Sequence, residues 1–311
     1  MLNIVFMGTP DFAVSTLESL LAWPDGQVVA VVTAPDRPAG RGRQLQASAV
    51  KVAAEAHGLH VLQPTNLKSP EFQSELKSYA ADLQVVVAFR MLPEAVWNMP
   101  RLGSINIHAS LLPQYRGAAP INWALMHGDA ETGVTSFFLR HEIDTGDLIF
   151  QDRVAITPED DFGSLYDKLK TAGAALARRS VEAIAAGTAP SIPQVQGEAL
   201  RPAPKIQKET GRLDFSRPAA DLVNWVRGLS PIPTAFAPLP DGRMLKIFRA
   251  QAVVPDATTE PLAAPGTWTS DGKTHLRVAA ADAWLDLLDV QLEGKKRMPV
   301  AELLRGFKLP A

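Results

Sequence analysis

The first half of the sequence alternates short apolar runs, rich in β-branched residues, with stretches whose apolar residues recur at helical spacing. In chain order these runs and stretches are Leu2–Met7, Asp11–Ala22, Val28–Thr33, Ser48–His57, Pro70–Ala80 and Leu83–Ala88. Strands that alternate with helices predict βαβ units, which place the strands in a mostly parallel sheet. Because the runs are apolar almost throughout, we expect helices on both faces of that sheet. Further strands are predicted at Gly103–His108, Val134–Leu139 and Leu148–Ile156, and a long helix at Phe162–Ala186.

The character of the sequence changes after residue 186. Residues 187–205 hold four prolines and two glycines with little apolar periodicity, which is typical of an interdomain linker. A predicted helix at Ala219–Arg227 is followed by short β-like runs, which suggest a small barrel. These runs are Leu245–Val253, Thr267, Leu276–Val278 and Trp284–Gln291. We therefore expect an α/β domain over 1–188, a linker over 189–205 and a second domain over 206–311.

Composition excludes several classes of protein. None of the 311 residues is cysteine, so disulfides, thiolate metal sites and cysteine nucleophiles are ruled out. No apolar run is long enough to span a membrane, and the N-terminus lacks the basic start of a secretory signal, so we expect a cytoplasmic protein. Residues 1–204 carry a net charge of −5 and residues 205–311 one of +3. That asymmetry is compatible with a polyanionic partner, and equally with uneven surface charge.

Common cofactor and nucleophile motifs are missing. The first strand runs into Gly8-Thr9-Pro10-Asp11, where a dinucleotide site needs G-x-G-x-x-G, so we expect no NAD. Ser110 does not stand in G-x-S-x-G, which argues against a hydrolase nucleophile. The histidines lack partners at metal-ligand spacing, so we expect no metal.

One polar group could carry chemistry. Asn106 and His108 alternate with isoleucines, so both face the same way near the C-terminal end of a predicted strand, where α/β sheets bind ligands. Asp144 stands in a polar turn further on. In acyl transfer to an amine, Asn106 could donate to the oxyanion, His108 could donate or accept a proton, and Asp144 could orient His108. The same residues could instead be structural, as loop hydrogen bonds and an Asx-turn aided by Gly146.

Longer motifs make this group specific. The stretch from Asn106-Ile-His108-Ala-Ser110 to Pro120, with Gly133-Val-Thr135 and Asp144-Thr-Gly-Asp147, resembles the signature of folate-dependent formyltransferases. Similar stretches are Phe6–Phe12, Pro35–Arg43, Lys205-Ile and Gly294–Met298, so the resemblance runs nearly end to end. It is strongest to the branch of the family that formylates methionyl-tRNA. After the Val85–Val87 strand the chain departs from the family, with Phe89-Arg90-Met91-Leu92-Pro93 where an aromatic, a Gly and a longer turn are usual.

The resemblance implies a Rossmann-like formyltransferase domain and a C-terminal small β-barrel, similar to an OB fold, that helps to bind tRNA. The donor would be 10-formyltetrahydrofolate, and the acceptor the amino group of methionine on initiator tRNA, for translation initiation. No metal is implied, and we expect a monomer. Asn106, His108 and Asp144 match the catalytic residues of the family. Its folate-contacting segment corresponds to Ser110, Leu111, Leu112 and Pro113.

Basic residues are the candidates for tRNA contacts. The segment Asp36–Lys51 has a net charge of +3, and its arginines suit the phosphates of a tRNA end, although a solvated loop without a partner is also possible. The candidates are Arg37, Arg41 and Arg43 in this segment and Lys205 and Lys208 in the second domain.

Two other functions stay open. One is formylation of a small amine, such as an amino sugar nucleotide or glycinamide ribonucleotide, for which the basic segment and the second domain would be superfluous. The other is a non-catalytic tRNA- or folate-binding protein, against which the intact Asn106, His108 and Asp144 argue.

Overall fold

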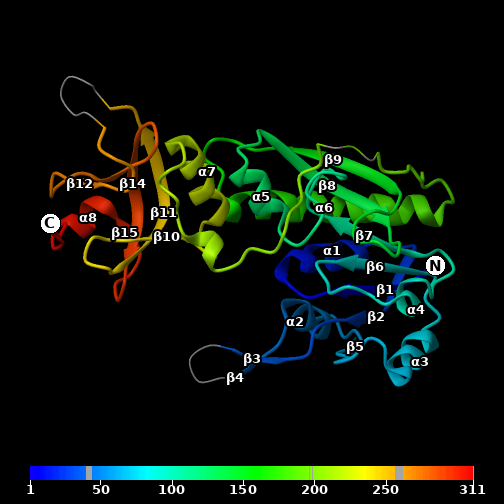
Figure 1. The fold of residues 1–311 in the computed structure, drawn as a ribbon. Coiled ribbons are helices and arrows are strands. Elements are labelled where there is room, and N and C mark those ends of the chain that lie inside the picture. Colours follow the sequence, from blue (N-terminus) through cyan, green and yellow to red (C-terminus); the bar gives the residue numbers. More distant parts are fainter. Residues whose placement is uncertain (40–43, 196, 198, 256–261, 311) are drawn as a thin grey trace. The chain divides into compact units, whose positions relative to one another are not determined.

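A computed structural model describes residues 1–39, 44–195, 197, 199–255 and 262–310. They form two compact units (Figure 1). The first comprises Met1–Gly117, Thr132–Ala155 and Tyr166–Pro202, and the second comprises Ala118–Glu131, Ile156–Leu165 and Ala203–Ala311. The linker expected at residues 189–205 stays a prediction, because the two compact units are defined by contacts between segments and each combines segments that are separate along the chain. None of the helices described is both long and apolar enough to cross a membrane.

The first unit is built on a seven-stranded sheet. In spatial order its strands are β5 (Val61–Leu62), β2 (Gly26–Val32), β1 (Leu2–Gly8), β6 (Leu83–Val87), β7 (Ser104–His108), β8 (Glu131–Phe138) and β9 (Leu148–Ala155). The strands from β5 to β7 pair in parallel, and β8 pairs antiparallel with β7. The predicted mostly parallel α/β sheet is therefore confirmed.

Apolar side chains bury both faces of this sheet. On β1, Val5 and Met7 belong to one cluster with Phe72 of α3, whereas Ile4 and Phe6, which point to the opposite face, are also fully buried. The helices of this unit are α1 (Asp11–Leu21), α2 (Ala49–Ala56), α3 (Pro70–Ser78), α4 (Glu94–Trp97) and most of α6 (Phe162–Ala185). Continuous burial of this kind explains why the strands read as unbroken apolar runs.

The turn from β1 into α1 is tight, and Gly8 makes it possible. A Cβ at Gly8 would lie 2.7 Å from the Cβ of Ala13 and 3.1 Å from the carbonyl oxygen of Val87. Pro10 is the N-cap of α1, in extended conformation. The requirement for glycine here comes from helix–strand packing, so a dinucleotide motif is not needed to explain it.

Local periodicity placed the longer elements within a few residues, but not the short ones. The basic segment contains a two-stranded hairpin of β3 (Arg37–Ala39) and β4 (Gln44–Gln46). Strands of two or three residues and a single turn of helix show too little periodicity to be recognised.

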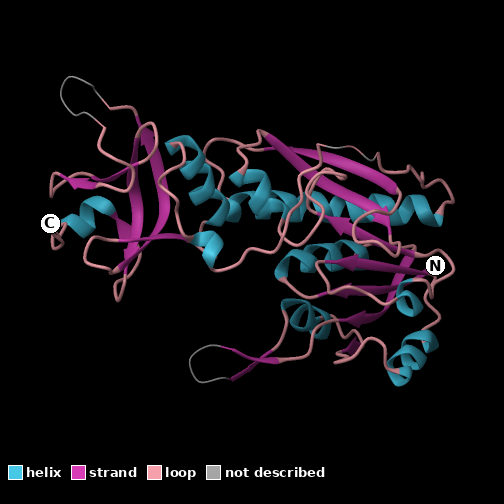
Figure 2. Cartoon of the chain, viewed as in Figure 1, coloured by secondary structure: helices cyan, strands magenta, loops and turns pink. Residues whose placement is uncertain are grey.

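The second unit contains an antiparallel six-stranded sheet that curls into a half-barrel (Figure 2). Its strands are β10 (Ala235–Pro238), β11 (Met244–Val253), β14 (Trp284–Leu292), β13 (Leu276–Ala279) and β12 (Trp268–Ser270) in spatial order, with β15 (Met298–Pro299) beside β14. The register of β11 on β14 shifts around Arg249, and such irregularities bend a strand and help the sheet to curl. The predicted small barrel-like domain is confirmed.

Helices complete the core of the second unit. They are α5 (Pro120–Met126), η1 (Glu209–Gly211), α7 (Ala219–Leu229) and α8 (Val300–Leu304). Leu222, Val226 and Leu229 of α7 are buried with Leu245 and Ile247 of β11. The amide of Asn122 on α5 donates to the Gly228 carbonyl of α7 at 2.7 Å, which explains why α5 belongs with a unit that lies mostly later in the chain.

Candidate active site

Asn106 and His108 lie on β7, whose neighbours are β6, in parallel, and β8, antiparallel. As the alternation predicted, the two side chains share one face of the strand. His108 is buried, with 7% of its surface exposed, whereas Asn106 is half-buried. The side-chain amide of Asn106 makes no hydrogen bond with the part of the chain that the structure describes. Its N–H groups are thus available to a ligand.

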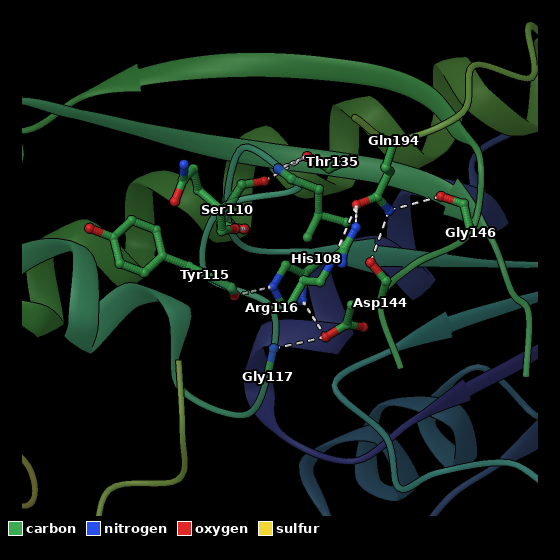
Figure 3. A network of polar contacts seen from close by, with 11 residues as sticks. His108, Ser110, Tyr115, Arg116, Gly117, Thr135, Asp144, Gly146 and Gln194 are labelled. Atoms are coloured by element: carbon green, nitrogen blue, oxygen red, sulfur yellow. Dashed lines mark hydrogen bonds and ion pairs between the residues drawn. The ribbon is translucent and has the colours of Figure 1, made fainter. Parts of the chain in front are cut away.

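The imidazole of His108 lies between a carbonyl and a carboxylate (Figure 3). Its Nε2 is 2.8 Å from the carbonyl oxygen of Tyr115. Because a carbonyl can only accept, Nε2 carries a proton in this arrangement. Its Nδ1 lies 3.9 Å from Oδ2 of Asp144, and both side chains are about nine-tenths buried. A proton at Nδ1 would therefore face the carboxylate of Asp144.

Asp144 stands in a turn with unusual backbone geometry. Its φ is 55°, in the left-handed region that non-glycine residues seldom adopt. Its Oδ2 accepts the N–H of Gly117 at 2.9 Å, which ties the turn to the segment after β7. Gly146, two residues on, packs against the carbonyl of Phe138 so closely that a Cβ would collide with it. The glycine in Asp-Thr-Gly-Asp is thus explained by close approach.

The predicted folate-contacting segment, Ser110 to Pro113, is held by hydrogen bonds that are buried or partly buried. The Ser110 hydroxyl donates to the Gln114 carbonyl at 2.6 Å. Thr135 of β8 donates its hydroxyl to the Ser110 carbonyl at 2.6 Å and accepts the Leu112 N–H at 3.1 Å. The side chains of Ser110 and Leu112 are buried, whereas Leu111 and Pro113 keep partly exposed surface. Contact with folate stays a prediction for all four residues.

The predicted tRNA-binding residues are spread over both units. Arg37 is exposed on β3, and Lys205 and Lys208 are exposed in the second unit, while Arg41 and Arg43 lie outside the described residues. Each of these roles stays a prediction.

Lys51, which contributes to the charge of the basic segment, is already paired. Its ammonium donates to the Asp36 carboxylate at 2.7 Å. This hydrogen bond lowers the pKa of Asp36 and raises the pKa of Lys51. Among the described residues of this segment, Arg37 is the basic side chain that forms no ion pair.

A cavity of about 320 Å³ opens beside this basic segment. Its lining includes Thr9 after β1, Ala34 after β2 and Phe89 after β6, so it lies at the C-terminal edge of the parallel strands. Arg37 and Arg90 also line it. This edge is where open α/β sheets bind ligands.

Residue types and spacing did not reveal several groups that support the site. His108 is oriented by a main-chain carbonyl, that of Tyr115, which no residue pattern marks. Gln194 donates to the carbonyls of Asp144 and Gly146 from within the predicted linker. The only feature of the sequence that could have indicated Gln194 is an amide side chain within a proline-rich segment, and that feature is weak.

Comparison with known proteins agrees with this geometry. Residues 2–181 match the Formyl transferase family, and residues 205–308 match its C-terminal domain. A methionyl-tRNA formyltransferase from Bacteroides fragilis is 53% identical over 99% of this chain and 96% of its own length. The enzyme of that name from Flavobacterium johnsoniae is 44% identical over 98% and 96%.

Solved structures share the fold at much lower identity. WlaRD, a sugar 3N-formyl transferase, superposes with a TM-score of 0.67 at 15% identity, over 95% of this chain and 99% of its own. HypX from Aquifex aeolicus superposes with a TM-score of 0.62 at 18% identity, over 99% of this chain and 49% of its own. Full-length identity, and not fold alone, decides the assignment: the chain belongs to the methionyl-tRNA formyltransferase family.

Proposed function

We propose that this protein transfers the formyl group of 10-formyltetrahydrofolate to the α-amino group of methionine esterified to initiator tRNA. The product, formylmethionyl-tRNA, would serve translation initiation. The observation that carries the proposal is the buried His108 between the Tyr115 carbonyl and the Asp144 carboxylate, beside an Asn106 amide with unused N–H groups. The names of the full-length relatives support methionyl-tRNA as the acceptor.

The transfer needs an acid, a base and a hydrogen-bond donor that stabilises the oxyanion. The amine nitrogen of methionine attacks the formyl carbon, so a new C–N bond forms and the carbonyl oxygen becomes an oxyanion. The amine must then lose a proton. Cleavage of the bond between the formyl carbon and N10 of the folate completes the reaction, and N10 takes up a proton as it leaves. A single group can therefore serve as base and then as acid, if it takes the proton from the amine and passes it to N10.

Asn106 and His108 divide these tasks. The N–H of Asn106 donates to the oxyanion, where preorganised donors contribute most. The free position of His108 is Nδ1, since Nε2 is committed to the Tyr115 carbonyl. Nδ1 takes the amine proton, and Asp144, at 3.9 Å, stabilises the imidazolium until the proton passes to N10. We assign no covalent intermediate with the enzyme.

The remaining predicted contacts divide between the two substrates. Leu111 and Pro113 offer partly exposed apolar surface that suits a flat heteroaromatic ring such as that of folate. Arg37 and its neighbours Arg41 and Arg43 would contact phosphates of the tRNA end, as would Lys205 and Lys208 from the second unit.

The test offers the purified protein 10-formyltetrahydrofolate with either charged initiator tRNA or an amino sugar nucleotide. The sugar acceptor is included because WlaRD, with a similar fold, formylates a sugar. We expect formylmethionyl-tRNA and little formylated sugar. Transfer to the sugar nucleotide alone would refute the acceptor, and binding of tRNA without transfer to either acceptor would refute the proposed catalysis.

A further inference from the structure

Part of the predicted linker is pinned to the active-site turns. We call residues 191–195, 197 and 199–201 the strap; all of them belong to the first unit. Ile192 forms a two-way backbone bridge with Leu148, with N···O distances of 2.8 and 3.0 Å. The hydroxyl of Ser191 donates to Oδ2 of Asp147 at 2.8 Å. A segment with the composition of a flexible linker is therefore fixed beside the turn that carries Asp144.

Gln194 makes the central contacts of the strap (Figure 3). Its Nε2 donates to the carbonyl of Asp144 at 2.9 Å and to that of Gly146 at 2.8 Å. Its Oε1 accepts from Nε and Nη2 of Arg116, at 3.1 and 2.6 Å. Both N–H groups of the amide are thus used on the Asp144 turn, and its oxygen is used on the segment that follows β7.

Other polar contacts of the Asp144 turn go to side-chain carboxylates: the Gly117 N–H binds that of Asp144, and Ser191 and Arg140 bind that of Asp147. His141, Glu142 and Ile143 are exposed, so apolar packing does not fix this side of the turn. Asp144 itself has a φ of 55°, a conformation that persists only where surrounding contacts impose it. The two hydrogen bonds from Gln194 act on the carbonyl of Asp144 and on that of Gly146.

Contacts other than the one with His108 must fix the position of the Asp144 carboxylate, because the distance between these two side chains is long. At 3.9 Å the two groups make no direct hydrogen bond, and they attract by charge only once His108 is protonated, so this contact does not itself fix their separation. The strap also reaches the other side of His108. The N–H of Tyr115 donates to the Arg201 carbonyl at 2.7 Å, and the carbonyl of Tyr115 binds Nε2 of His108.

We propose that Gln194 is a positioning residue for the formyl-transfer reaction, which sets the place of Asp144 relative to His108. Gln194 acts through the Asp144 turn and touches neither substrate. The inference rests on the proposed function, because it assigns Gln194 to the same reaction. It predicts that loss of the Gln194 amide slows the chemical step while substrate binding is retained.

Two substitutions separate the roles of the amide. Gln194→Met keeps the length of the side chain and removes both hydrogen-bonding functions. Gln194→Glu keeps an acceptor for Arg116 but cannot donate to the carbonyls of Asp144 and Gly146 while it is ionised. Val195→Ala is the matched control, since Val195 is the adjacent residue and is 76% exposed.

The experiment measures kcat, both KM values and the dependence of kcat on pH, and follows hydrogen exchange of residues 140–147. For both Gln194 variants we expect kcat to fall about tenfold or more, since a lost hydrogen bond is worth roughly that factor. Both KM values should stay within about twofold, the pH profile of kcat should shift, and exchange in the turn should rise. Val195→Ala should match the wild type in each readout.

Unchanged kcat in both Gln194 variants would overturn the inference, as would a rise in KM without a fall in kcat or an unshifted pH profile. Faster exchange throughout the first unit would also overturn it, because the effect would then be general unfolding. A wild-type protein that cannot formylate methionyl-tRNA would refute the proposed function and with it the catalytic part of this inference. Exchange of the turn would still decide whether Gln194 holds it.

Discussion

The buried hydroxyl of Thr135 supports the segment that follows His108, and its removal should be costly. Thr135 is fully buried on β8. Its hydroxyl donates to the Ser110 carbonyl, accepts the Leu112 N–H and also accepts from Nε2 of Gln151 at 2.9 Å. Thr135→Val preserves the shape of the side chain and removes these three hydrogen bonds.

The magnitude follows from the groups left without partners. Gln151 still donates to the Leu112 carbonyl at 2.8 Å, so losing its hydrogen bond to Thr135 costs little. The Ser110 carbonyl and the Leu112 N–H each lose the Thr135 hydroxyl, and a buried polar group left unsatisfied costs about 1–3 kcal/mol. Two such groups predict a loss of about 2–6 kcal/mol in the free energy of unfolding. Urea denaturation measures this loss, and formyl transfer should weaken in parallel because the segment after β7 shifts.

Thr132 provides a matched control on the same strand. Its side chain is 2% exposed, and its hydroxyl is buried without a hydrogen-bond partner among the described residues. Thr132→Val therefore removes an unsatisfied polar group and should leave stability unchanged or raise it. If Thr135→Val is as stable as the wild type, or if Thr132→Val is destabilised equally, the hydrogen-bond argument is wrong.

Two further predictions concern the turn and the basic hairpin. Gly146→Ala would place a Cβ against the Phe138 carbonyl, so we expect loss of turnover and a lower melting temperature, whereas Gly197→Ala, with open space around it, should change neither. Arg37→Ala should raise KM for methionyl-tRNA without changing KM for the folate donor. It should also reduce the salt dependence of tRNA binding by about one unit of slope, and an unchanged slope would exclude a phosphate contact.

The sequence predicted most of the fold because the signals for its larger elements are local. The buried strands and amphipathic helices of the first unit show their period within ten or twenty residues, and the helix Phe162–Ala185 was placed within one residue of its end. The hairpin β3–β4 and the strand Val61–Leu62 were missed, since two or three residues show no period. The packing of α5 with α7 was also missed, because it joins residues about a hundred positions apart.

The candidate site was predicted less completely, for a physical reason. Alternation along one strand placed Asn106 and His108 on a common face, but the partners of His108 come from elsewhere. One is the main-chain carbonyl of Tyr115, which any residue could supply. Another is Asp144, 36 positions away, whose geometry depends on a positive φ and on Gln194, a further 50 positions along. Contacts of this kind follow from the folded chain and not from spacing.

The central claim is that His108, stabilised by Asp144, carries the proton in formyl transfer. Single-turnover formylation of methionyl-tRNA by the wild type and by Asp144→Asn tests it most directly. Asparagine keeps an oxygen that can accept the Gly117 N–H, so the fold should survive while the charge that faces Nδ1 of His108 is lost. The account predicts a fall of at least about 100-fold in the rate of transfer, as expected when acid–base catalysis is removed. Near-normal formylation by a folded Asp144→Asn protein would contradict it.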